Sequence, residues 1–215
     1  MKIVIIGATG FVGSAILKEL VSRGHSITAI ANKVVDSNLD NINWIETDVK
    51  DVEKLSKGLA GNDLIVSAYN AGWTNPNLYQ DFLQGSKSIQ EAVKKSGVKR
   101  LIVSGGAGSL YISDGLQVVD TPAFPADWKE GAKAARDYLN ILKEEKELDW
   151  TFFSPALEMH PGITTGRTGN YRLGNDNPVF DANGKSQLSV EDLAVVIADE
   201  AETPKHHQAR FTAAY

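Results

Sequence analysis

Apolar runs and helically spaced apolar residues alternate along this chain. Short runs rich in β-branched residues predict six strands, at residues 2–6, 26–31, 42–47, 63–69, 99–104 and 150–154. Apolar residues at helical spacing predict a helix from Phe11 to a stop at Gly24 and further helices at 51–59, 78–95, 129–146 and 190–201. A short strand is expected near 209–212. Asp51 is the expected cap of the second helix, and Gly97 is expected to end the third.

This order of elements predicts the fold class. Strands with apolar interiors that alternate with helices indicate a parallel sheet covered on both faces. Because crossover connections are right-handed, we expect one doubly wound α/β domain, a Rossmann fold, over residues 1–215.

Two segments rich in Gly, Pro and Asp interrupt the alternation, at residues 105–128 and 155–187. Long irregular stretches inside a compact domain are usually functional loops. Ligands of doubly wound sheets bind at the carboxyl ends of the strands. We therefore assign both segments to the substrate side, the second as a small C-terminal substrate-side segment.

The turn after the first strand carries the clearest chemical signal. Its residues, Gly7-Ala8-Thr9-Gly10-Phe11-Val12-Gly13, lie between a strand and a helix. In such a turn Gly7 allows the sharp bend, Gly10 lets phosphate oxygens approach the backbone, and Gly13 lets the helix pack closely on the sheet. Unpaired amides and the helix dipole then favour a pyrophosphate, so Gly7, Thr9, Gly10, Phe11 and Val12 are expected to bind a dinucleotide.

Composition narrows the choice of partner. The net charge of −5 argues against nucleic acid and anionic membranes, which reward basic patches. The absence of cysteine excludes disulfides and thiolate chemistry and fits a reducing cytoplasm. No run is long enough to span a bilayer, and the short N-terminal run is not a signal peptide. We expect a cytoplasmic monomer or homodimer that acts on a small molecule.

With these residues in view, the chain resembles the short-chain dehydrogenase/reductase superfamily. It is most similar to the atypical NAD(P)H-binding branch, which includes NADH-flavin reductases and nitrogen-metabolite-repressor-type proteins, and it also fits the broader NAD-dependent epimerase/dehydratase label. The resemblance covers nearly the whole chain. It rests on the glycine turn, Asp48-Val49, the stretch 59–63, the Ser104-Gly105-Gly106-Ala107-Gly108 segment, Lys133 and Ser154-Pro155-Ala156.

The resemblance implies further cofactor contacts. An acidic residue after the third strand contacts adenine in this family, which suggests Asp48, with Val49 beside the ring. The alternative is that Asp48 only caps the next turn. The backbone at Ala68-Tyr69 would pass under the cofactor ribose, and Pro155, after the sixth strand, would also lie at the cofactor.

The end of the second strand bears on the choice between NAD and NADP. An NAD site places a carboxylate there for the ribose 2′-hydroxyl, but the chain has Asn32 and Lys33, and Asp36 comes slightly too late. Lys33 and Asn32 could instead bind a 2′-phosphate, so NADP(H) is favoured over NAD(H). The alternative is that Lys33 is a solvated surface lysine.

The catalytic residues of the superfamily are only partly present. Its dehydrogenases use Ser, Tyr and Lys, with Tyr and Lys four residues apart on one helix face. Lys133 occupies the lysine position, but Lys129 occupies that of the tyrosine, and Tyr138 is followed four residues later by Leu142. Ser104 and Lys133 are therefore the catalytic candidates. Ser104 contacts the nicotinamide or the acceptor, or is only a turn residue at the end of a strand. Lys133 binds the ribose or is a surface lysine.

An incomplete triad favours chemistry that needs no protein acid. Hydride transfer to a planar acceptor, such as FMN, FAD or a quinone, fits this requirement. A non-catalytic redox sensor that binds NAD(P)(H) is the alternative, and a sugar-nucleotide epimerase or dehydratase is a second alternative.

Other residues are open to two interpretations. Tyr69, Trp73, Tyr111 and Trp128 could form an aromatic wall for the acceptor or pack in the core. Glu158 and His160 could contact substrate, and His160 could supply a proton there or be held by structural partners. Arg167 and Arg172 could bind an anionic acceptor or lie on the surface. We expect no metal site, because His206-His207 lacks further ligands at suitable spacing.

Overall fold

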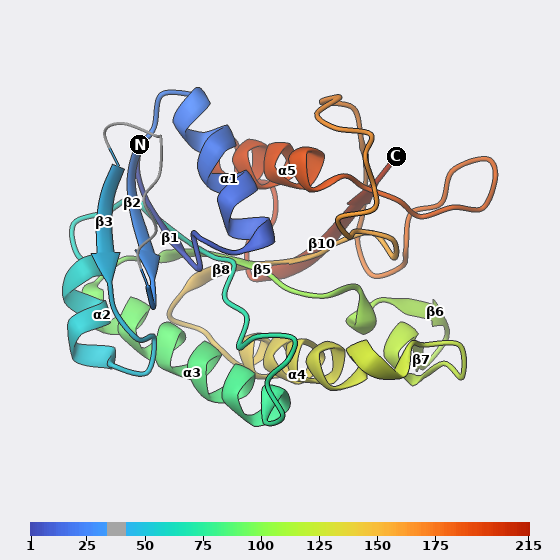
Figure 1. Ribbon diagram of the computed structural model, residues 1–215, viewed down its shortest axis with the longest axis horizontal. Coiled ribbons are helices and arrows are strands. Elements are labelled where there is room, and N and C mark those ends of the chain that lie inside the picture. Colours follow the sequence, from blue (N-terminus) through green and yellow to red (C-terminus); the bar gives the residue numbers. More distant parts are fainter. Residues whose placement is uncertain (34–41) are drawn as a thin grey trace.

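The computed structural model describes residues 1–33 and 42–215. These residues form an eight-stranded sheet in the order β3-β2-β1-β4-β5-β8-β10-β9 (Figure 1). The strands are β1 (Lys2–Ile6), β2 (Ser26–Ala31), β3 (Ile42–Glu46), β4 (Leu64–Ser67), β5 (Arg100–Ser104), β8 (Asp149–Ser154), β9 (Arg172–Gly174) and β10 (Ala209–Ala214). All neighbours pair in parallel except β9, which is antiparallel to β10. The predicted Rossmann-like α/β fold is confirmed.

Helices cover both faces of the sheet (Figure 1). The helices α1 (Phe11–Ser22) and α5 (Val190–Glu202) pack side by side on one face. On the other face lie α2 (Val52–Leu59), α3 (Leu78–Ser96) and α4 (Ala126–Lys143), each packed against the next. The strand order reverses between β1 and β4, so the glycine turn after β1 lies at the switch point where such folds bind ligands.

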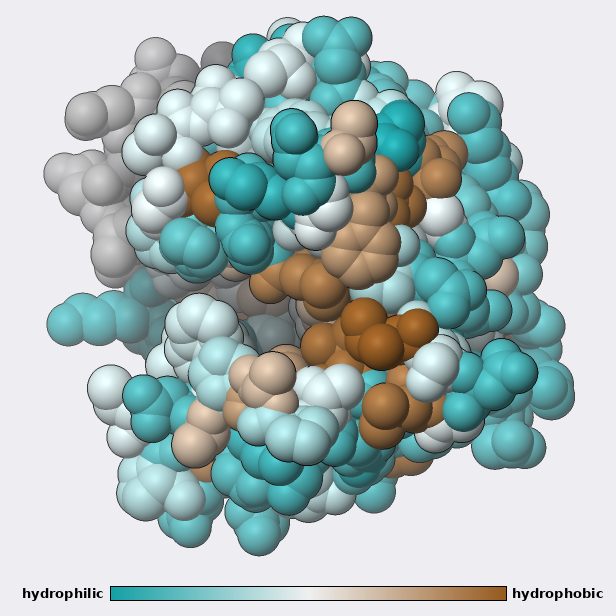
Figure 2. Space-filling model, turned by 90° about the vertical axis from the view of Figure 1, so that its right-hand side faces the viewer, coloured by the Kyte–Doolittle hydropathy of each residue, from teal (hydrophilic) through white to brown (hydrophobic). Residues whose placement is uncertain are grey.

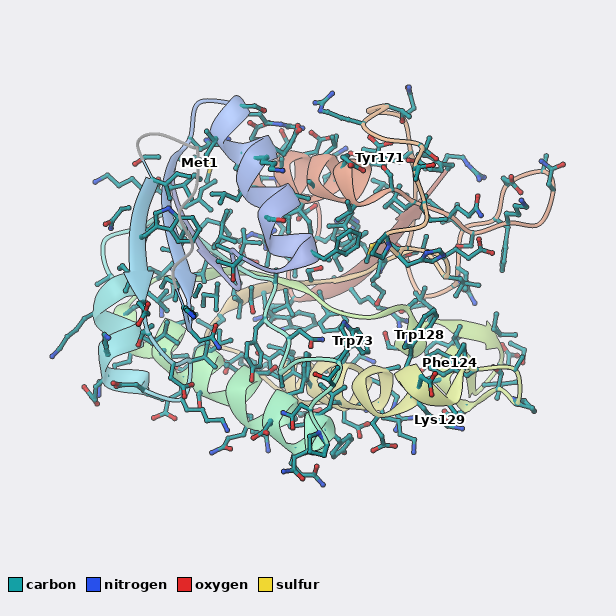
Figure 3. The ribbon with its side chains drawn as sticks, viewed as in Figure 1. Met1, Trp73, Phe124, Trp128, Lys129 and Tyr171 are labelled. Atoms are coloured by element: carbon teal, nitrogen blue, oxygen red, sulfur yellow. The ribbon has the colours of Figure 1, made fainter. Side chains whose placement is uncertain are left out.

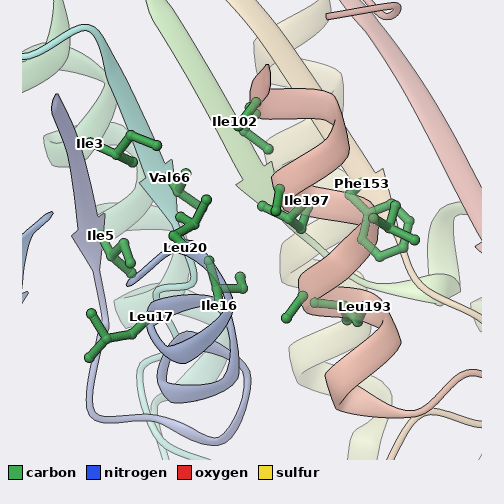
Figure 4. Close-up of a cluster of buried hydrophobic side chains, with 14 of the residues drawn as sticks. Ile3, Ile5, Ile16, Leu17, Leu20, Val66, Ile102, Phe153, Leu193 and Ile197 are labelled. Carbon is green, nitrogen blue, oxygen red and sulfur yellow. The ribbon is translucent and has the colours of Figure 1, made fainter. Parts of the chain in front are cut away.

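Alternating side chains of the strands feed two buried clusters, because successive strand residues point to opposite faces. In β1, Ile3 and Ile5 face α1 and α5, whereas Val4 and Ile6 face α2, α3 and α4. Figure 4 shows the first cluster, in which strand side chains meet Ile16, Leu17 and Leu20 of α1 and Leu193 and Ile197 of α5. The sheet is thus buried on both faces, which holds the carboxyl ends of its strands in fixed relative positions.

Local signals account for several helix ends. The Asp51 side chain accepts a hydrogen bond from the Lys54 amide (3.0 Å) and caps α2, and Gly97 ends α3 in the left-handed region (φ 83°). Helix α4 begins at Ala126, three residues before the predicted start. Pro125 precedes it with φ −60°, a value compatible with helix entry, and the polar and aromatic first turn hides the helical pattern.

The two irregular segments contain structure that the sequence did not predict. Residues 105–128 hold two short 3₁₀ helices and a hairpin of β6 (Tyr111–Ser113) and β7 (Leu116–Gln117). The hairpin is fixed to the sheet by Arg210, whose side chain is only 2% exposed. The Arg210 guanidinium donates to Ser109 O (2.5 Å), pairs with Asp176 and lies 5.5 Å from the centre of the Tyr111 ring.

The second segment divides into parts with different neighbours. Residues 157–158 pair with 186–188 near the end of β8. Residues 167–171 instead lie against α1 and α5: Arg167 pairs with Glu19 (2.8 Å), and Thr168 and Gly169 donate backbone hydrogen bonds to Asp192. The substrate-side assignment therefore stays a prediction for the parts near β8, while residues 167–171 serve to fasten the chain to the helices.

Candidate functional site

The backbone of the glycine turn has the form that its sequence predicts. Gly7 has φ +80°, and its amide donates to Ile30 O of β2 (2.9 Å). A Cβ atom on Gly7 would lie 2.6 Å from Ala68 O, because the segment after β4 passes directly beside the turn. Only glycine fits this backbone, and the turn brings the predicted segments at Gly7 and Ala68 together.

The start of α1 leaves amide groups available to a ligand. Gly10 is the N-cap residue, and its amide donates to Gly7 O (3.0 Å). The first amide bonded within the helix is that of Ser14, to Gly10 O (2.8 Å), so those of Phe11, Val12 and Gly13 precede the hydrogen-bond ladder. The first turn of α1 carries no acidic residue. Its amides and the helix dipole can therefore stabilise an anion.

Gly13 sets the distance between α1 and the turn. A Cβ atom there would lie 2.1 Å from Gly7 O and 2.8 Å from Gly7 C, both backbone atoms. A Cβ atom on Gly10, in contrast, would meet one atom within 4 Å, Gly7 O at 3.3 Å, and otherwise point into open space. Gly13 thus serves packing, while Gly10 leaves room in front of the helix end.

The ends of β2 and β3 carry the predicted adenosine contacts. Asn32 and Lys33 are exposed directly after β2, and Asp36 lies outside the described residues. The exposed Asp48 accepts a hydrogen bond from the Lys50 amide (2.9 Å), which is the turn-capping role left open by the sequence, and Val49 packs against the core. Asp48 retains a second carboxylate oxygen that can accept from a ligand.

The backbone and the side chain of Tyr69 have different roles. Its ring stacks on Phe82 (5.9 Å between centres) and its hydroxyl donates to Asp81 O (3.2 Å). A Cβ atom on Gly85 of α3 would lie 2.4 Å from the Tyr69 hydroxyl, so this glycine makes room for the ring. Burial raises the pKa of Tyr69 to about 12, so the phenol stays protonated. The side chain belongs to the core, and the backbone runs along the turn.

Ser104 and Pro155 lie at the same edge of the sheet. Ser104 ends β5 and is half-buried, and Pro155 is buried directly after β8, the neighbouring strand. Ser104 pairs with Phe153 in the sheet, and the Gly105 amide donates to Phe153 O (2.8 Å). Ser104 therefore ends the strand next to β4, and Pro155 follows the strand beyond it. Both residues lie on the β4 side of β1, whereas Lys33 follows β2 on the other side.

Helix α4 does not direct the expected lysine into the sheet. Its buried stripe includes Gly131, Ala135 and Tyr138, and helical periodicity places Lys133 on the opposite side. The Lys133 ammonium pairs with Glu130 (3.2 Å). Figure 3 shows Lys129 also on the side of α4 that faces away from the sheet. Burial raises the pKa of Tyr138 above its ordinary value, so that phenol stays neutral within the core.

The aromatic candidates fall into two groups. Tyr69 is packed in the core and Tyr111 stands over Arg210, whereas Trp73 and Trp128 are 60% and 49% exposed. Figure 2 views the molecule from the right-hand side of Figure 1. It shows a hollow between two lobes, with hydrophobic residues beside the hollow. Sequence patterns did not single out Gly131, over which the Trp73 ring lies, since nothing in a lone helical glycine indicates its partner.

The remaining polar candidates are held by internal partners. Glu158 pairs with Gln187, and His160 accepts from the Gly162 amide (3.1 Å). Arg172 donates to Phe180 O (2.8 Å), and Arg167, as above, is bound to Glu19. Among the described residues no group of three or more His, Cys, Asp or Glu is arranged to hold a metal ion, and His206 is stacked on Phe211 (4.2 Å between ring centres). Over that same part of the chain, no helix combines the length and apolar character needed to cross a membrane.

Comparisons with known proteins agree with this arrangement. A full-length relative is the uncharacterized protein YwnB of Bacillus subtilis, 35% identical over 99% of this chain and 97% of its own. The fold matches a crystal structure from Bacteroides thetaiotaomicron, named as a candidate epimerase, with a TM-score of 0.90, 43% identity and coverage of 100% and 96% of the two chains. It also matches a candidate NADH-flavin reductase from Streptococcus pneumoniae, with a TM-score of 0.87, 34% identity and coverage of 100% and 99%. The profile of the NAD(P)H-binding family matches residues 7–204, and the chain belongs to this family of Rossmann-fold proteins.

Proposed function

We propose that the protein is an NAD(P)H-dependent oxidoreductase that passes hydride to a planar acceptor, a flavin or a quinone. The observation that carries this proposal is the glycine turn, where the amides at the start of α1 face open space beside Gly10. The pyrophosphate of the cofactor would bind there. The adenosine half would extend over the ends of β2 and β3, near Lys33 and Asp48, and the nicotinamide half toward β4 and β5.

The placement of α4 supports a reaction in which the acceptor takes its proton from water and not from a protein side chain. Helical periodicity places Lys133 on the side of α4 away from its buried stripe, and Figure 3 shows Lys129 on the side away from the sheet. Tyr138 is buried in the core. Reduction of a flavin or quinone requires one hydride from the nicotinamide ring and one proton, which water can deliver to a ring nitrogen or oxygen of the acceptor. The protein then supplies alignment and exclusion of water, and the cofactor supplies the chemistry. The similarity to a candidate NADH-flavin reductase points the same way.

The finer assignments follow from single residues. Exposed Lys33 after β2 supports a preference for the 2′-phosphate of NADP(H), because its ammonium can pair with the phosphate. Ser104, at the end of β5, would lie beside the nicotinamide half. Absence of cysteine fits a cytoplasmic enzyme.

The test measures NADPH and NADH oxidation by absorbance, with FMN, FAD and a naphthoquinone as acceptors. The expected result is turnover well above the uncatalysed rate, faster with NADPH. Turnover no faster than the protein-free background would overturn the proposal. Tight NADPH binding without turnover on any of the acceptors would instead support the alternative of a non-catalytic redox sensor.

A matched variant links turnover to the glycine turn. Gly10→Ala adds a methyl group that meets only Gly7 O, at 3.3 Å, and otherwise occupies the space in front of the helix amides. The free protein should keep its melting temperature to within about 3 °C. Binding of NADPH should weaken at least about tenfold, because the methyl group stands where a phosphate must approach the backbone. Unchanged NADPH affinity would place the cofactor elsewhere.

A further inference from the structure

Two tryptophans, one in a loop and one on a helix, remain largely exposed. Trp73 belongs to the segment between β4 and α3, and Trp128 to the first turn of α4. Their exposed fractions are 60% and 49%. Figure 3 shows both side chains on the side of α4 that faces the sheet, opposite to Lys129. The two indoles therefore line the space between the helix layer and the carboxyl ends of the strands.

Both indoles belong to the same face of α4. A Cβ atom on Gly131 would lie 2.8 Å from Cζ3 and 3.3 Å from Cη2 of Trp73, so the six-membered ring of Trp73 rests on the α4 backbone at Gly131. Trp128 precedes Gly131 by three residues, and residues at this spacing share a helix face. Gly131 thus gives the Trp73 ring a place on the helix face that also carries Trp128.

Trp73 is held in place by the loop that presents it. Gly72 adopts φ +97°; its amide donates to the Asn70 side chain (2.7 Å), and its carbonyl accepts from the Asn75 amide (3.0 Å). The Asn75 side chain donates to Ala71 O (3.2 Å) and to the Asp81 carboxylate (2.9 Å). A loop fixed in this way has little backbone entropy left to lose when a ligand stacks on the ring that it carries.

The indole surface begins close to the expected nicotinamide position. After β5, Gly106 and Gly108 pack on α4. A Cβ atom added to Gly106 would lie 3.5 Å from Ala135 Cβ, and one added to Gly108 would lie 2.9 Å from Ala132 Cβ. Ala135 is four residues beyond Gly131, a rise of about 6 Å along the helix. The Trp73 ring therefore lies about one helical turn from the segment that follows Ser104.

We propose that Trp73 and Trp128 form the acceptor platform, on which the fused ring of a flavin or quinone stacks. This inference rests on the proposed function, because it assigns the second substrate of the same reaction. Indole faces are large, flat and apolar, so they favour stacked planar rings over non-planar substrates. The platform selects the acceptor by ring shape, independently of the phosphate or side chain that the acceptor carries.

The experiment measures ring binding without turnover. Riboflavin, FMN and a naphthoquinone are titrated into the protein in the absence of NADPH, followed by quenching of flavin fluorescence or by calorimetry. Trp73→Leu and Trp128→Leu should each weaken all three about tenfold, because leucine keeps apolar surface but lacks a flat ring. Trp128→Phe should lose less. A loss confined to FMN would overturn the proposal, since the phosphate would then carry recognition.

A second variant moves the platform without removing it. Gly131→Ala places a methyl group 2.8 Å from Trp73 Cζ3 and must displace the ring. It should weaken acceptor binding several-fold while NADPH affinity stays unchanged. Gly58→Ala in α2 is the matched control, where the new methyl meets Ile45 Cδ1 at 3.1 Å. Unchanged acceptor affinity in Gly131→Ala and in both leucine variants would overturn the proposal.

The two proposals fail in different ways. If wild-type protein binds the rings on this platform but oxidises no NADPH with them, the proposed function fails and the platform stands. If NADPH is oxidised with wild-type KM for the acceptor in both leucine variants, the platform fails and the proposed function stands.

Discussion

Gly13→Ala tests whether close packing of α1 on the glycine turn creates the cofactor site. The added methyl carbon would lie 2.1 Å from Gly7 O, 2.8 Å from Gly7 C and 3.1 Å from Ala8 Cα. All three atoms are backbone, and Gly7 is further fixed by its hydrogen bond to Ile30 O. No side chain can rotate to relieve the conflict, so α1 must move away from the turn by about 1 Å.

The expected cost follows from two opposing terms. Overpacking of a rigid site destabilises proteins by about 1–3 kcal/mol. Replacing a helical glycine by alanine returns about 0.5–1 kcal/mol through backbone entropy. The net loss is at most about 2.5 kcal/mol, and its central value of about 1 kcal/mol corresponds to a melting temperature lower by about 2–4 °C for a chain of this size. Because the amides of Phe11 and Val12 move with α1, NADPH affinity should fall at least about tenfold.

The assay combines thermal unfolding of the free protein with calorimetric titration of NADPH. Gly10→Ala is the informative partner, since it should spare stability and still weaken binding. Gly58→Ala controls for the generic effect of replacing a helical glycine. If Gly13→Ala unfolds at the wild-type temperature and binds NADPH with wild-type affinity, the close packing has no bearing on the site and the reasoning from its geometry is wrong.

Three further variants test separate parts of the structure. Lys33→Ala should lower NADPH affinity about tenfold and leave NADH affinity unchanged in calorimetry, and equal effects would remove the argument for the 2′-phosphate. Lys133→Ala should change kcat/KM for NADPH less than about threefold, because the Lys133 ammonium pairs with Glu130 on the solvent side of α4. A tenfold loss would instead support the ribose contact that the family resemblance implies. The pKa of Glu19 is lowered, first by its hydrogen bond from Arg167, so its contribution is present above the unfolded pKa of about 4.3 and lost as pH falls through the folded value. Glu19→Gln should therefore destabilise by about 1.5–3 kcal/mol at pH 7, and urea unfolding at pH 3 should show a much smaller difference.

The sequence predicted those parts of the fold that depend on local patterns. Apolar runs identified β1 and β4, and an aromatic-rich run identified β8, because a strand buried on both faces carries apolar side chains at successive positions. The glycine turn was recognisable because Gly7 and Gly13 satisfy backbone requirements that no other residue meets. Asp51 and Gly97 marked helix ends through their own side chain or backbone freedom.

Other elements exist only because of partners distant in sequence. Strand β9, Arg172–Gly174, has three residues and no apolar run, and it forms because β10 offers an edge for antiparallel pairing. The hairpin at Tyr111 is held by Arg210, nearly a hundred residues away in the chain. Lys133 matched a family position by spacing, yet the buried stripe of α4 determines which way it points.

The candidate acceptor site also depends on residues that are distant in sequence, so the sequence alone does not indicate it. An exposed tryptophan and a helical glycine are each uninformative in a sequence, because most tryptophans pack in cores and most helical glycines have no partner. Contact between Trp73 and Gly131 joins a loop after β4 to a helix before β8, and only the completed sheet brings these segments together. If the platform binds the acceptor, substitutions at Gly131 should change acceptor affinity in proportion to side-chain volume, with serine close to alanine and valine more damaging. An effect that instead followed helix propensity would assign Gly131 to folding alone.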